Sequence, residues 1–192
     1  QTALADAFDA ANNAPNSIYE LLIGGLLAAS LVPLFTSLLS STTQTRESQH
    51  GTDAIISVSL LFLGVITIAS IVAAPAIFHL FSIHPAAGVD VEAFRSAGTA
   101  LTRIFVVQIF FYGVSALCSA LLNARKRFFA AAWSPIAANI IAIFFLLSIA
   151  SNSQPDITDV LDGSTLMWQL GLSTTVGIAV MAIIQVVAVH RS

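Results

Sequence analysis

Charged residues are scarce in this sequence. Asp, Glu, Lys and Arg make up only 9% of its 192 residues, whereas 57% of the residues are hydrophobic. A soluble globular domain carries about 25% charged residues. A core of ordinary size cannot bury so large an apolar excess, so the composition excludes an ordinary soluble domain and indicates an integral membrane protein.

Other features are missing as well. The single cysteine, Cys118, lies inside an apolar run and cannot form a disulfide within the chain. The sequence contains no phosphate-binding glycine-rich loop, no GxSxG nucleophile motif and no HExxH zinc motif. His79 and His84 have no neighbouring ligands with the spacing of a metal site. We therefore expect no enzymatic activity, no cofactor and no bound metal.

What the sequence does contain is a series of long apolar segments. A helix needs about 20 apolar residues to cross the hydrocarbon core of a bilayer. These segments are too long and too rich in Ala and Leu for the strands of a β-barrel, which run to about 10 residues. The predicted fold is an all-α, polytopic transmembrane bundle with five spans, at about 18–41, 54–82, 97–122, 129–151 and 166–190. Pro15 is expected to mark the start of the first long helix, because proline is best tolerated in a first helical turn.

Basic residues gather on one side of this predicted topology. Arg125, Lys126 and Arg127 form a short turn between two spans, and Arg46 and Arg191 fall on the same side if all five segments cross. By the positive-inside rule this side is cytoplasmic and residue 1 lies outside. A turn with three basic residues is too short for a nucleic-acid site, so we interpret it as a topology anchor beside anionic lipid headgroups. Residues 1–192 then look like a fragment of a larger transporter.

Two ionisable residues lie closest to membrane depth, and such groups are functional candidates because burying a charge in the membrane is costly. Arg103 is about six residues into its span, where it could line a cavity for an anionic substrate or extend to the interface. Glu20 is about two residues into its span, where it could act in a site or simply favour the positive end of the helix dipole.

A polar stripe follows the same span as Arg103. It consists of Gln108, Tyr112, Ser115 and Ser119, which share one helix face. The stripe could line an aqueous cavity or hydrogen-bond to a neighbouring helix. Arg103 lies about 140° away from Gln108 on a straight helix, so both can line one cavity only if the helix bends.

Three stretches of the chain resemble the lipid II flippase family (MurJ/MviN). They are ADAFDAANNAPNSIYELLIGGLLAASLVPLF at 5–35, SALLNARKRFFAAAWSPIAANI at 119–140, and Thr175-Val176-Gly177 followed by Gln185. They occur in the order and spacing of that family and cover most of the chain. The resemblance places residues 1–192 in the N-terminal lobe of a transporter with the multidrug and oligosaccharidyl-lipid exporter fold.

The resemblance also implies a function. The substrate would be lipid II, the undecaprenyl-pyrophosphate-linked peptidoglycan precursor, moved from the inner to the outer leaflet of the bacterial cell membrane by alternating access. The partners would be lipid II, membrane lipids and the remaining helices of the transporter. Asp6, Asn16 and Arg103 match positions of the family pattern, and we carry them over with Glu20 as candidate substrate contacts. The chain departs from the family at Tyr19-Glu20, where many members have two arginines.

Two other functions remain open. A cation-coupled drug or oligosaccharide-lipid exporter of the same superfamily would need an acidic ion site within the membrane, for which Glu20 is the candidate. A non-transporting membrane scaffold would show Arg103 paired and buried, or facing headgroups, and would have no cleft.

Overall fold

The computed structural model describes residues 3–20, 33, 36–37, 46–82, 90–150, 161 and 164–191. Every element of these residues is a helix, which confirms the predicted all-α fold. The helices are α1 (Ala3–Tyr19), α3 (Arg46–Val72), α4 (Ala74–Phe81), α5 (Val91–Phe105), α6 (Gln108–Ala124), α7 (Phe128–Ala150) and α9 (Ser164–His190). Helices satisfy their own backbone hydrogen bonds, which is a requirement for chains that cross hydrocarbon.

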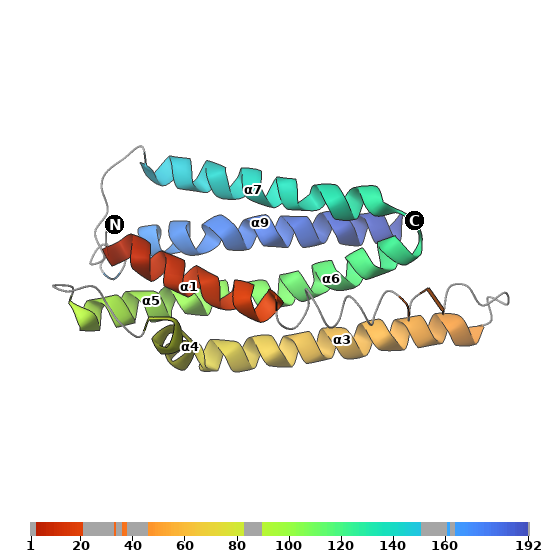
Figure 1. The fold of residues 1–192 in the computed structure, drawn as a ribbon, viewed down its shortest axis with the longest axis horizontal. Coiled ribbons are helices and arrows are strands. Elements are labelled where there is room, and N and C mark those ends of the chain that lie inside the picture. The colour runs from red at the N-terminus through yellow and green to blue at the C-terminus, as the bar shows by residue number, and fades with distance from the viewer. Residues whose placement is uncertain are drawn as a thin grey trace.

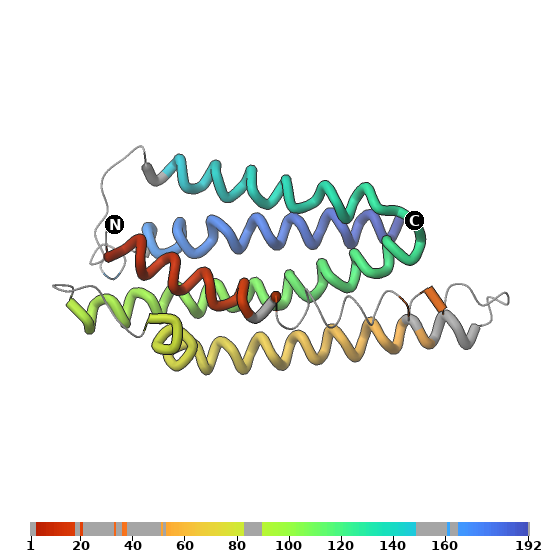
Figure 2. Tube along the Cα trace, viewed as in Figure 1, coloured from red at the N-terminus to blue at the C-terminus, as the bar shows by residue number. Residues whose placement is uncertain are grey.

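The long helices run side by side along the length of the molecule (Figure 1). α9 is central: it packs extensively against α7 and α6 and also touches α5. The start of α3, the turn between α6 and α7 and the end of α9 lie at one end of the bundle, while α1, α5 and α9 begin at the other (Figure 2). The helix ends next to Arg46, Arg125 and Arg191 thus lie at the same end of the bundle, as the predicted topology requires.

Four helical segments of the described residues are long and apolar enough to cross a membrane, one of them made of α5 and α6 together. Within the described residues they are Asp53–Val72, Val91–Ala124, Phe128–Ser148 and Thr165–His190, close to four of the predicted spans. The predicted span 18–41 falls mostly outside the described residues. Many large apolar side chains on α3 and α7 are exposed, including Leu61, Phe62, Ile140, Phe144 and Leu147. Such surfaces suit contact with lipid or with further helices.

Two predicted helix boundaries are wrong in detail. The predicted span 54–82 divides at Ala73 into α3 and α4, and Figure 1 shows α4 turned away from the axis of α3. Pro75 accounts for the division, because it has no N–H to donate to the carbonyl of Ile71. Pro15 does not start a helix, as we expected, but lies inside α1. Its ring is almost completely buried, so packing compensates for the missing hydrogen bond.

α4 folds back onto α5 through a close contact. The ring of Phe78 lies directly against Gly98, where any Cβ would overlap the ring. Phe78 also packs against Phe94 with ring centroids 5.4 Å apart, and Phe8 of α1 meets Phe105 edge-on at 5.4 Å. These aromatic contacts form one core that joins α1, α4 and α5.

The predicted span 97–122 contains an interruption. α5 ends at Phe105 and α6 begins at Gln108, and the amides of Val107 and Phe110 bond to carbonyls three residues back, at 3.3 and 3.2 Å. Neither glycine nor proline marks this point in the sequence. It coincides instead with Gln108, whose side chain is bound to α9.

Candidate functional site

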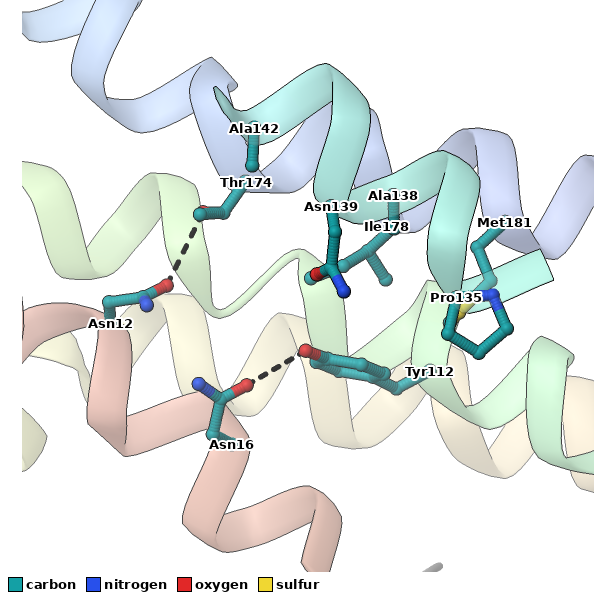
Figure 3. A pocket seen from close by; sticks show the side chains of 10 residues that line it. All are labelled: Asn12, Asn16, Tyr112, Pro135, Ala138, Asn139, Ala142, Thr174, Ile178 and Met181. Carbon is teal, nitrogen blue, oxygen red and sulfur yellow. Dashed lines mark hydrogen bonds between the residues drawn. The ribbon is translucent and has the colours of Figure 1, made fainter. Parts of the chain in front are cut away.

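A cavity of about 280 Å³ lies between α1, α6, α7 and α9 (Figure 3). Its lining is Asn12, Asn16, Tyr112, Pro135, Ala138, Asn139, Ala142, Thr174, Ile178 and Met181. None of these side chains carries a formal charge at neutral pH. The cavity therefore combines polar groups with apolar walls, the usual composition of a small-molecule site.

α1 supplies two carboxamides to the cavity. Asn12 and Asn16 are four residues apart and so share one face of the helix. The hydroxyl of Tyr112 donates to Asn16 Oδ1 at 2.8 Å, and that of Thr174 donates to Asn12 Oδ1 at 3.3 Å. Both carboxamide oxygens are thus occupied, whereas the two Nδ2 groups have no acceptor among the described residues.

α7 supplies a third carboxamide, Asn139. Its side chain is exposed to the cavity and makes no hydrogen bond within the described part of the chain. Figure 3 shows this carboxamide directed toward the side of the cavity that carries Asn16 and Tyr112. Asn139 therefore offers both an N–H donor and an oxygen acceptor to whatever enters the cavity.

Gln108, at the start of α6, is hydrogen-bonded to α9 next to the cavity. Its Nε2 donates to the hydroxyls of Thr174 and Thr175 at 2.8 and 2.9 Å. Those hydroxyls donate onward, to Asn12 Oδ1 and to the Gly171 carbonyl, so Gln108 must be the donor. Its buried Oε1 has no partner among the described residues. The network ties the polar wall of the cavity to the interruption between α5 and α6.

Gln185 of α9 links α6 and α7 by side-chain hydrogen bonds. Its Oε1 accepts from Ser115 at 2.9 Å and from Ser119 at 3.0 Å, both on α6, and its Nε2 donates to Ser134 Oγ of α7 at 2.6 Å. Gln185 itself is 2% exposed. These bonds hold α6, α7 and α9 in a fixed register around the cavity.

The basic turn ends α6 and touches the end of α9. Lys126 has a φ of 59°, and the amide of Arg127 bonds to the Leu122 carbonyl at 2.8 Å, which closes the helix with a left-handed residue. Arg125 Nη1 donates to the Val189 carbonyl at 3.1 Å, near the C-terminus of α9. Lys126 and Arg127 are exposed, so their charges face outward at this end of the bundle.

The family model for the MurJ lipid II flippase matches residues 1–192, which is the whole chain. The chain belongs to this family. The resemblance drawn from the three motifs is thereby confirmed, and MurJ membership makes the chain a membrane protein of a transport family in peptidoglycan synthesis. No solved structure matches the chain.

The predicted substrate contacts occupy different places in this MurJ-family fold. Asn16 lines the cavity. Asp6 is half-buried near the start of α1, about 120° around the helix from Asn12, and Glu20 is exposed directly after α1. Arg103 is exposed in the last turn of α5, opposite the buried face that contains Leu101. Asp6, Glu20 and Arg103 are not among the residues that line the cavity.

The predicted polar stripe divides between two environments. Gln108, Ser115 and Ser119 are used in hydrogen bonds to α9, whereas Tyr112 lines the cavity and bonds to α1. Asn12 and Asn139 lie within the stretches that resemble the family, but sequence analysis did not name them or Thr174 as site residues. The two asparagines could have been noticed, because a carboxamide without a hydrogen-bond partner in an apolar helix is costly and therefore indicates a function. The described residues contain no group of three His, Cys, Asp or Glu side chains that could hold a metal.

Proposed function

We propose that this chain forms one lobe of a transporter that moves lipid II from the inner to the outer leaflet by alternating access. The observation that carries the proposal is the uncharged polar cavity between α1, α6, α7 and α9, in a chain of the MurJ family. A headgroup of sugars, peptide and pyrophosphate cannot enter hydrocarbon without replacing its bonds to water. Asn12, Asn16, Tyr112 and Asn139 supply such replacements.

The cavity favours a transporter over a scaffold. A scaffold needs packed helices, whereas here hydrogen-bonding groups of Asn139 remain open to the cavity within the described residues. No carboxylate is among the described residues that line the cavity, so these residues offer no acidic site for a coupling cation. The polar lining is thus better suited to a polar organic headgroup than to an ion.

The pyrophosphate needs a cation, and Arg103 is our candidate for that contact. Its guanidinium has no ion pair with a described residue, and the side chain is exposed. Arg103 is five residues before Gln108, or about 7.5 Å along an uninterrupted helix, so the proposed contact lies outside the cavity, on the side of α5. Cations near a phosphate form charge-assisted hydrogen bonds, which are about twice as strong as neutral ones.

The proposed location is the bacterial cell membrane, with the turn at Arg125, Lys126 and Arg127 on the cytoplasmic side. The distribution of basic residues supports this orientation, since Arg46 and Arg191 belong to chain ends at the same end of the bundle. The proposed partners are lipid II, the surrounding lipids and the remaining helices of the transporter.

The experiment is complementation in a bacterium whose own flippase can be depleted. The full-length protein should restore growth and keep lipid II from accumulating in the inner leaflet, as measured by the amount accessible to an external enzyme. If lipid II stays inaccessible from the outside when the full-length protein replaces the depleted flippase, the proposed function is wrong.

Arg103→Ala should reduce complementation strongly, and Arg103→Lys should restore part of it, because a lysine retains the charge. Arg95→Ala is the matched control, since Arg95 is exposed on the same helix two turns earlier. Normal transport by Arg103→Ala would remove Arg103 from the substrate site.

A further inference from the structure

We propose that the cavity between α1 and α7 recognises a neutral secondary amide of the lipid-linked headgroup, such as the acetamido group of an amino sugar, and not its pyrophosphate. This inference rests on the proposed function, which it refines by assigning the cavity to one part of the substrate. The assignment follows from the kind of hydrogen-bonding groups that the cavity offers.

Among the described residues, the cavity lining offers both donors and acceptors but no formal charge. Asn12 and Asn16 each use the carboxamide oxygen within the protein and leave the Nδ2 donor open, while Asn139 leaves both of its polar atoms open. A secondary amide has one carbonyl acceptor and one N–H donor, so it can bond to the oxygen of Asn139 and to a carboxamide N–H at once. A pyrophosphate has only acceptors at neutral pH, so it would leave the oxygen of Asn139 without a hydrogen-bond donor.

The size and walls of the cavity agree with this assignment. Its volume of about 280 Å³ is at the lower limit of small-molecule sites, which span about 300–1,000 Å³. It can therefore take one sugar ring or a short amide segment, and not a whole disaccharide with its peptide. Ala138, Ala142 and Ile178 supply apolar walls, which suit the methyl group of an acetamide.

The test measures binding by the full-length protein in lipid nanodiscs to three ligands. They are undecaprenyl pyrophosphate, the same carrier with one N-acetylated amino sugar, and lipid II. Asn139→Leu removes both open polar atoms at nearly constant volume. It should weaken binding of the amide-bearing ligands by about 3- to 10-fold, the net value of one to two hydrogen bonds. Binding of undecaprenyl pyrophosphate should change less than about twofold.

Asn13→Leu is the matched control. Asn13 precedes Asn16 by three residues on α1, but it is exposed and does not line the cavity. The same substitution there should leave all three affinities unchanged. Asn139→Gln keeps the carboxamide and should retain part of the preference for amide-bearing ligands, which separates loss of recognition from loss of folding.

The outcomes are distinct. An effect with the one-sugar ligand assigns the recognised amide to the sugar, and an effect with lipid II alone assigns it to the peptide. An equal loss for undecaprenyl pyrophosphate, or no change for any ligand, overturns the inference. If the unaltered protein binds lipid II no better than a bulk phospholipid, the proposed function fails instead.

Discussion

The side-chain amide of Gln185 donates a 2.6 Å hydrogen bond to Ser134 Oγ, one residue before Pro135 of α7. Proline has no N–H, so the carbonyl of Ala131 lacks its usual helical partner. The hydroxyl of Ser134 donates to that carbonyl at 3.4 Å. Gln185 thus positions the hydroxyl that bonds to the carbonyl of Ala131 at a proline site in a neighbouring helix.

Gln185→Leu should destabilise the protein by about 1–3 kcal/mol, because it leaves buried hydroxyls on α6 and α7 without their partner. Thermal unfolding of the purified protein in detergent measures the effect. Gln169→Leu is the matched control on α9, since no hydrogen bond of Gln169 is seen among the described residues. Equal melting temperatures for the two variants would contradict a stabilising role of Gln185.

Gly177 sets the close approach of α9 to α7. A Cβ at this position would lie 2.6 Å from the carbonyl oxygen of Ala138, and backbone cannot move aside as a flexible side chain can. Gly177→Ala should therefore cost about 1–3 kcal/mol and lower the melting temperature.

The control for this variant is Gly64→Ala in α3, where a Cβ meets nothing within 4 Å. Alanine is favoured over glycine within a helix by about 1 kcal/mol, so this control should be neutral or stabilising. A comparable loss at both positions would show that helix packing at Gly177 is not responsible.

Lys126 occupies a left-handed backbone conformation with a φ of 59°. A non-glycine residue pays about 1–2 kcal/mol for this conformation, whereas glycine adopts it freely. Lys126→Gly should raise the melting temperature by an amount equivalent to about 1 kcal/mol. Arg127→Gly removes the same charge at a position without positive φ, and it should not stabilise the protein.

Orientation in the membrane can be tested with single cysteines in a Cys118→Ala background. Lys126 and Glu92 are exposed at opposite ends of the bundle. Lys126→Cys should react with a membrane-impermeant maleimide only in inside-out vesicles, and Glu92→Cys only in intact cells. The reverse pattern would invert the proposed topology.

The helices themselves were predictable because long apolar runs have few alternatives in a membrane. The candidate spans of the described residues lie near four of the predicted ones, although the second ends at Val72 and the third begins at Val91. The division at Ala73 had a local signal in Pro75, but a proline does not reveal by itself whether a helix bends or ends. At Pro15 the same residue type lies within α1, because its buried ring is packed there.

The site was harder to predict because its members come from distant parts of the chain. The polar stripe on α6 was visible in the sequence, but its partners Thr174 and Gln185 are more than 60 residues away. The interruption before Gln108 has no glycine or proline to indicate it. It coincides with the hydrogen bonds of Gln108 to α9, which a local sequence pattern does not encode.

The ring of Phe78 lies against Gly98, so the residue types at positions 78 and 98 depend on each other. With alanine or serine at 98, the ring of Phe78 must move, a smaller residue must replace it, or α4 must leave α5. Paired changes at these two positions among natural relatives would therefore report on how this corner folds. Reading them together would sort family members into those that keep α4 against α5 and those that build this corner differently.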